Sequence, residues 1–226
     1  MHKNEERVAI LLGGASKVGY ATARLFIERG LRLAVIARDA GAEKVTDAVR
    51  GLGEGVAHYP MNFGSVAGLR DAVEGVAQRF GRIDILVNCV SDEVRSSLAD
   101  TTESMWHDCM DAEIKAPFFT MQACAEHMRR TGGGRIVNLL SAVAVVADGC
   151  HALYATAKGA LSAMTREWAV DLCNDNIQCN SVLPGSSPDK TASVIVFLAL
   201  CAPAYLTAAQ IAADDGNTAF WDDFNA

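Results

Sequence analysis

The side chains best suited to chemistry are a tyrosine and a lysine four residues apart, with a serine upstream of them. Tyr154 and Lys158 bound the segment Tyr-Ala-Thr-Ala-Lys, and Ser141 precedes it. On a helix this spacing places the phenol and the ammonium on one face, one turn apart. The cation favours the phenolate and so eases proton transfer through the tyrosine, and a serine hydroxyl can hold a carbonyl oxygen. The set predicts proton transfer to or from an alcohol, with a hydride cofactor supplying the rest of a carbonyl reduction.

The same spacing also occurs in helices that merely expose the pair to water, so the rest of the chain has to decide. Short apolar runs alternate with amphipathic stretches, as expected for a parallel sheet covered on both faces. Strands are expected at Val8–Leu12, Leu33–Ile36, Val56–Tyr59, Ile83–Val87, Ile136–Leu140, Ile177–Val182 and Gln210–Ala213. Helices are expected at Val18–Arg29, Ala42–Leu52, Val66–Phe80, Glu103–Arg130, Ala152–Asn174 and Lys190–Leu200. This alternation predicts an α/β fold: a single-domain, Rossmann-type, doubly wound parallel β-sheet flanked by helices, spanning residues 1–226.

Composition excludes several classes of function. The net charge of -7 is spread along the chain without a basic stripe, which argues against nucleic acid as a partner. The apolar runs are too short to cross a bilayer, and the N-terminus lacks the apolar segment of a signal peptide. Seven cysteines without a C-x-x-C pair and five histidines without ligand spacing predict free thiols in a reducing cytoplasm and no metal site.

A glycine-rich loop follows the first expected strand. It runs from Gly13 to Gly19 and includes Ser16, Lys17 and Val18. Glycines there let the backbone approach a pyrophosphate, and the next helix offers its N-terminal N–H groups. The spacing is not the usual G-x-G-x-x-G, so an ordinary tight turn is the alternative.

The second expected strand ends in Arg38 and Asp39. An arginine at this point accommodates a 2′-phosphate, whereas an acidic residue accepts from a ribose 2′-hydroxyl. Arg38, with Lys17 adding charge, therefore favours NADP(H). The alternatives are that Asp39 serves the ribose of NAD, or that Arg38 is a solvated surface residue.

The order of these features resembles the short-chain dehydrogenase/reductase family over about residues 7–216. The glycine loop is followed by Asn88, Ser141, the Tyr154–Lys158 segment and a Pro-Gly pair, each after its expected element. The resemblance implies that Tyr154 is the general acid/base, that Lys158 lowers its pKa and binds the nicotinamide ribose, and that Ser141 orients the substrate oxygen. It also implies cofactor contacts for Gly13, Ser16, Lys17, Val18, Gly19, Arg38, Asn62, Phe63, Asn88, Tyr154, Lys158, Pro184 and Gly185.

The sequence departs from the family pattern at several of these positions. Lys17 replaces the middle glycine of the loop, which resembles the NADPH-dependent pteridine reductases. Asn-Asn-Ala-Gly becomes Asn88-Cys89-Val90-Ser91. The asparagine that holds a proton-relaying water aligns with Glu113, which is included among the expected catalytic residues. Its carboxylate can hold the same water or pair directly with Lys158, and a misplaced alignment with a solvated glutamate is the alternative.

The region that forms a substrate lid in the family is shortened after Pro184 and Gly185. This leaves three interpretations: a large substrate such as one tethered to a carrier protein, a site closed by a neighbouring subunit, or loss of the reaction. The tail at residues 217–226 carries Phe220, Trp221 and Phe224, which either pack on their own subunit or cover the site.

Next to the tyrosine, His151 is expected to contact substrate or to share proton transfer, with a solvated loop histidine as the alternative. The sequence as a whole predicts an NADPH-dependent reductase of a small-molecule or carrier-tethered carbonyl, assembled as a homodimer or homotetramer. Two alternatives remain open. One is a non-catalytic subunit that partners an active homologue, and the other is a dehydratase or isomerase that keeps the nucleotide as a structural element.

Overall fold

The computed structural model describes residues 7–38, 51 and 55–219. Within them a parallel sheet has the strand order β3-β2-β1-β4-β5-β6-β7. Its strands are β1 (Val8–Leu12), β2 (Arg32–Arg38), β3 (Val56–Met61), β4 (Ile85–Asn88), β5 (Gly134–Leu139), β6 (Ile177–Pro184) and β7 (Gln210–Ala213). The predicted Rossmann-type α/β fold is confirmed. The expected helix Ala42–Leu52 (apart from Gly51), Asp39 and the aromatic residues of the tail lie outside the described residues.

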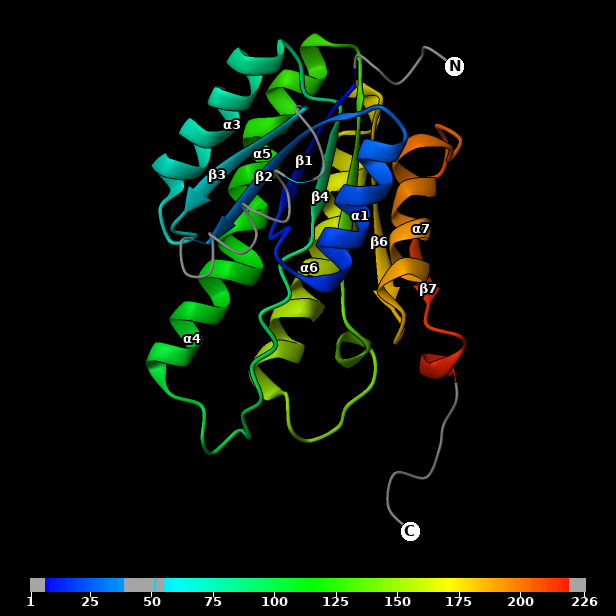
Figure 1. The fold of residues 1–226 in the computed structure, drawn as a ribbon. Helices are drawn as coiled ribbons and strands as arrows, with labels where there is room; N and C mark the ends of the chain where they lie inside the picture. Colours follow the sequence, from blue (N-terminus) through cyan, green and yellow to red (C-terminus); the bar gives the residue numbers. More distant parts are fainter. Residues whose placement is uncertain (1–6, 39–50, 52–54, 220–226) are drawn as a thin grey trace.

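Helices cover both faces of the sheet (Figure 1). Two of them, α1 (Lys17–Glu28) and α7 (Pro188–Leu200), pack together on one face. The other face carries α3 (Val66–Phe80), α5 (Ala116–Arg130) and α6 (Ala152–Asp171), and α4 (Glu103–Met110) lies beyond the sheet edge beside α6.

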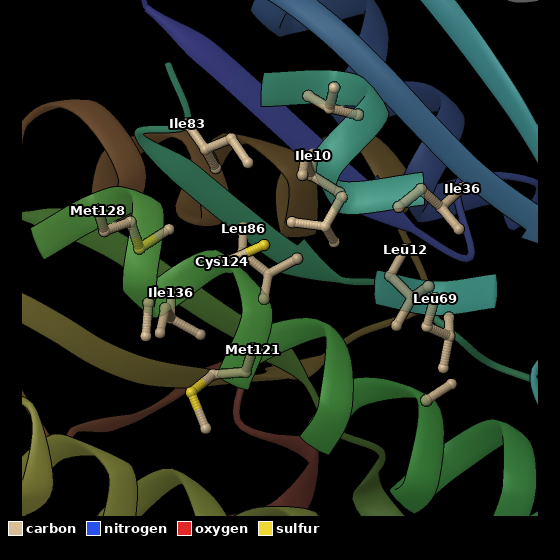
Figure 2. Close-up of a cluster of buried hydrophobic side chains, with 14 of the residues drawn as sticks. Ile10, Leu12, Ile36, Leu69, Ile83, Leu86, Met121, Cys124, Met128 and Ile136 are labelled. Atoms are coloured by element: carbon tan, nitrogen blue, oxygen red, sulfur yellow. The ribbon is translucent and has the colours of Figure 1, made fainter. Parts of the chain in front are cut away.

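The first strand shows why the central strands read as continuously apolar. All five residues of β1 are buried. Val8, Ile10 and Leu12 enter the core beneath α3 and α5, whereas Ala9 and Leu11 enter the core beneath α1 and α7. Since strand side chains alternate between faces and both faces are covered, every position has to be apolar. Figure 2 shows the first of these cores, in which Ile10 lies opposite Leu86 on the neighbouring strand β4.

One predicted helix differs from its expected form. The stretch Glu103–Arg130 is helical throughout but is interrupted by a π-helical turn at Asp111–Lys115, which joins α4 to α5. Such turns insert an extra residue and are frequent at functional sites. Here the turn contains Glu113, whose side chain is fully buried.

The sheet creates a crevice where its strand order reverses. β1 pairs with β2 on one side and with β4 on the other, so connections leave the carboxyl ends of β1 and β4 in opposite directions. Ligands of open α/β sheets bind at such a point. The glycine loop follows β1, Asn88 ends β4, and Ser141 follows β5. β6 ends at Pro184 and α7 begins at Pro188, so only three residues lie between them.

Candidate active site

Tyr154 and Lys158 lie on the inner side of α6 and are almost entirely buried. The exposed fraction is 2% for Tyr154 and 0% for Lys158. The ammonium nitrogen lies 5.4 Å from the centroid of the phenol ring. Lys158 Nζ donates to the carbonyl oxygens of Val90 at 2.8 Å and Leu139 at 3.0 Å. The predicted pairing of the two side chains along one helix face is therefore present in the structure.

Glu113 forms a direct ion pair with the lysine. Its Oε2 lies 2.8 Å from Lys158 Nζ, and both side chains are inaccessible to solvent. Its Oε1 accepts the backbone N–H of Asp92 at 2.9 Å. Of the two arrangements expected for this carboxylate, the structure has the direct pair. A buried carboxylate is costly unless it is paired in this way.

The environment moves the pKa values of both titratable groups on α6 upward. Burial lowers the pKa of Lys158, but Glu113 and Tyr154 raise it by more, so the lysine pKa lies above its ordinary value and the ammonium form is favoured. Burial raises the pKa of Tyr154, and the Lys158 charge offsets that rise only in part, so the phenol pKa also lies above its ordinary value.

The phenol oxygen contacts Ser91, which was not among the site residues expected from the sequence. Tyr154 Oη lies 3.2 Å from Ser91 Oγ, and Ser91 is exposed. Ser141 follows β5, has extended backbone conformation and is partly exposed. Its hydroxyl makes no hydrogen bond to any residue between 55 and 219 or in the described N-terminal part. The only signal for Ser91 in the sequence is that it replaces the glycine of the family motif.

His151 is held between two carboxylates. Its Nδ1 lies 2.5 Å from Asp148 and its Nε2 lies 2.7 Å from Glu93, while the residue is only 6% exposed. A bridge between Ser96 and His151 joins the two loops involved. Both ring nitrogens are thus engaged within the protein, and the expected contact of His151 with substrate stays a prediction. Neither Glu93 nor Asp148 stood out in the sequence.

The glycine loop packs closely against neighbouring backbone at the β1 end of the crevice. Gly13 has φ 79°, and a Cβ there would lie 2.6 Å from the Val90 backbone. A Cβ on Gly19 would lie 2.8 Å from Gly14. Ser16 caps α1 by accepting the N–H of Gly19 at 3.0 Å. The N–H groups of Lys17 and Val18 have no acceptor among the described residues, which leaves the helix N-terminus able to receive an anion.

Arg38 spans from the end of β2 to the far side of this crevice. Its guanidinium lies 3.1 Å from the Asp92 carboxylate and donates to the Asp108 carbonyl at 3.3 Å. It also lies over the ring of Phe63, 5.5 Å from the centroid. Arg38 is therefore close to the other proposed cofactor residues, but one of its partners is an acidic side chain.

The remaining proposed cofactor residues lie along the same sheet edge. Asn62 is exposed, and its side chain accepts the N–H of Gly64 at 2.9 Å. Asn88 is buried and donates to Asn138 at 2.6 Å across β4 and β5. Pro184 and Gly185 are partly exposed at the end of β6, and a Cβ on Gly185 would lie 2.8 Å from the backbone after β7.

Four consecutive residues tie these groups together. We call the segment Val90–Glu93 the connecting segment. Its four residues contact, in chain order, Lys158, Tyr154, Arg38 and His151. The backbone N–H of Asp92 adds the contact to Glu113. The connecting segment, which follows β4, thus joins the end of the crevice that contains Arg38 to the end that contains α6.

Comparison with known proteins identifies the family. Residues 7–193 match the model of the short chain dehydrogenase family. The chain is 30% identical to the 3-oxoacyl-acyl-carrier-protein reductase FabG of Thermotoga maritima, over 94% of this chain and 98% of the relative. A solved acetoin dehydrogenase from Salmonella typhimurium has TM-score 0.87 and 25% identity, covering 96% of this chain and 100% of its own. A structure described as ElxO with NADP bound shares the fold, with TM-score 0.87, 19% identity and coverage of 95% and 99%. The chain belongs to the short-chain dehydrogenase/reductase family, an oxidoreductase family that binds NAD(P)(H).

Proposed function

We propose that this protein is an NADP(H)-dependent ketoreductase that reduces a carbonyl to an alcohol. The observation that carries the proposal is the buried Tyr154, with a lysine ammonium beside its ring and its hydroxyl at the open edge of the sheet. A phenol next to a fixed cation is suited to giving a proton to a developing alkoxide. The FabG relative acts, by its name, on a 3-oxoacyl group attached to a carrier protein.

The residues at the nucleotide end fit a dinucleotide. The close glycine contacts bring the backbone loop near the N-terminus of α1, whose first N–H groups are unpaired within the described chain. Arg38 and Lys17 would hold a 2′-phosphate, which is the basis for preferring NADP(H), and a relative in fold has NADP bound. When bound, the nicotinamide supplies the hydride.

Each residue of the α6 end has a separate role in the proposed reaction. Ser141, whose hydroxyl has no partner among the described residues, would hold the substrate oxygen. Tyr154 would donate its proton to that oxygen as the carbonyl carbon is reduced. Lys158 would stabilise the phenolate, and Glu113 would keep the ammonium charged and in place. The three-residue link between Pro184 and Pro188 supports a large or carrier-tethered substrate, because so short a link can cover little of the site.

A Tyr154→Phe variant tests the assignment. It removes only the hydroxyl, so NADPH binding should persist while turnover on any ketone that the parent protein reduces should fall by about 10²–10⁴-fold, the usual contribution of a positioned general acid. The measurement is NADPH consumption across a ketone panel, with fluorescence titration of NADPH binding as the folding control. Retained turnover in the variant would refute Tyr154 as the acid.

A non-catalytic subunit is the second candidate. It is favoured because two side chains expected to bind the cofactor already have partners within the protein. Lys158 already has Val90, Leu139 and Glu113 as partners, and Arg38 already has Asp92. A subunit freed from chemistry would show NADPH consumption by neither the isolated protein nor its Tyr154→Phe variant. Activity that appears only when an active homologue is added would support this reading.

We also propose a homo-oligomer formed through α5 and α6. A groove of about 730 Å³ lies between these helices and is lined by Phe118, Met164 and Trp168 among others. Phe118 is 39% exposed and Val170 is 71% exposed, which is a large apolar surface to leave in water. Light scattering should give a dimer or tetramer, and Val170→Lys should lower the assembly state.

A further inference from the structure

We propose that Ser91 relays protons between solvent and Tyr154. This inference rests on the proposed function, and it assigns a role to a residue at which the family motif has glycine, a residue without a hydroxyl. Its basis is the pattern of contacts around the two groups on α6. Tyr154 needs a new proton after each turnover. Because Tyr154 is only 2% exposed, a neighbouring hydroxyl that contacts solvent offers its oxygen a direct route for that proton.

The lysine side of the phenol is closed to proton transfer from water. Lys158 Nζ has three partners, the carbonyls of Val90 and Leu139 and the Glu113 carboxylate, and all lie in the interior. The other oxygen of Glu113 accepts the backbone N–H of Asp92, and an amide N–H does not shuttle protons at useful rates. The pair therefore fixes charge but offers no hydrogen-bonded path outward through the residues that the structure describes.

The serine side of the phenol is open. Ser91 Oγ lies 3.2 Å from Tyr154 Oη, and Ser91 is exposed. A hydroxyl can donate and accept at once, which is what a relay requires. Donation from Ser91 also favours the phenolate and lowers the pKa of Tyr154, in the same sense as Lys158, against the rise caused by burial.

The step balances without any further reactant. Tyr154 gives its O–H proton to the product oxygen and becomes phenolate. The Ser91 hydroxyl then passes its proton to the phenolate oxygen and takes one from water. The net result is one proton from solvent for each product molecule, and no electrons move through Ser91.

The kinetic test separates the first turnover from later ones. In Ser91→Ala the phenol starts protonated, so a single turnover should stay within about twofold of the parent, while multiple turnover should slow by about 10²-fold, the low end of a proton-transfer contribution. Ser91→Thr keeps a hydroxyl and should retain multiple turnover. Ser104→Ala, an exposed serine on α4, is the matched control. Equal multiple turnover in Ser91→Ala and parent would overturn the relay.

A second measurement does not depend on turnover. A difluorinated tyrosine placed at position 154, whose phenol ionises in an accessible pH range, can be titrated by fluorine NMR. Loss of the Ser91 hydroxyl should raise its pKa by about one unit, the effect of losing one hydrogen bond to a charged group. An unchanged pKa would overturn the proposal. If the parent reduces no ketone, the proposed function fails on its own, and this titration still decides whether Ser91 acts on the phenol.

Discussion

Two ion pairs at the carboxyl edge of the sheet are built from similar groups but have opposite surroundings. Lys158 and Glu113 have no solvent exposure, whereas the side chains of Arg38 and Asp92 are 40% and 48% exposed. The first pair lies under α6 and is fixed by backbone groups as well. The second crosses the crevice at the proposed nucleotide end. Both are reached through the connecting segment, Val90–Glu93.

The difference shows which pair can respond to a ligand. Breaking a buried pair leaves a charge without water, so the Lys158–Glu113 pair is a permanent part of the fold. An exposed pair contributes little to stability and is readily exchanged for a better partner. We therefore expect a phosphate bound at Arg38 to displace Asp92 at low cost, and we expect the pair between Lys158 and Glu113 to stay in place.

The largest effect should come from removing one member of the buried pair. Lys158→Met leaves the Glu113 carboxylate buried and alone, which should lower the free energy of unfolding by about 3–5 kcal/mol. The double variant Lys158→Met with Glu113→Met should recover most of this loss because no charge is stranded. Urea denaturation of the parent, the single variant and the double variant measures the difference. A single variant as stable as the parent would contradict the burial of this pair.

A smaller effect should appear at alkaline pH. The folded-state pKa of Tyr154 lies above the ordinary 10.0, so the unfolded chain loses this proton first as pH rises. The contribution of Tyr154 is complete below about pH 10 and declines as pH rises through the folded-state pKa. The stability of the parent relative to Tyr154→Phe should be flat below pH 10 and should fall above it. A difference that does not change with pH would contradict the phenol's environment.

The smallest effect on stability should come from the exposed pair. Asp92→Asn should change the free energy of unfolding by about 0–1 kcal/mol. It frees Arg38, so it should tighten NADPH binding several-fold, by roughly 3–10-fold for about 1 kcal/mol of interaction. Asp108→Asn is the matched control because Arg38 contacts only the backbone carbonyl of that residue. Weaker binding in Asp92→Asn would contradict the exchange described above.

The sequence predicted the fold best where residue spacing follows a regular pattern. Continuous apolar strands, the glycine loop and the four-residue spacing on α6 led to the sheet and to the Tyr154–Lys158 pair. The π turn could not be read from the sequence, because a helix with one extra residue has almost the same apolar pattern. The π turn nevertheless contains Glu113, whose side chain pairs with Lys158.

The contacts of the connecting segment were missed for a different reason. Ser91, Asp92 and Glu93 form an ordinary polar stretch, and their partners lie far away in sequence, on β2 and α6 and in the turn between α4 and α5. Only the folded chain brings these residues together. The same holds for His151, whose two carboxylate partners come from separate loops.

The most direct test of the central claim follows hydride transfer with and without the Tyr154 hydroxyl. NADPH carrying deuterium at its transferable position is incubated with a ketone panel, and the alcohols are analysed by mass spectrometry. The account predicts deuterium on the carbinol carbon with the parent protein and its near absence with Tyr154→Phe, at equal NADPH binding. Equal deuterium transfer by both proteins would contradict the claim that Tyr154 supplies the proton.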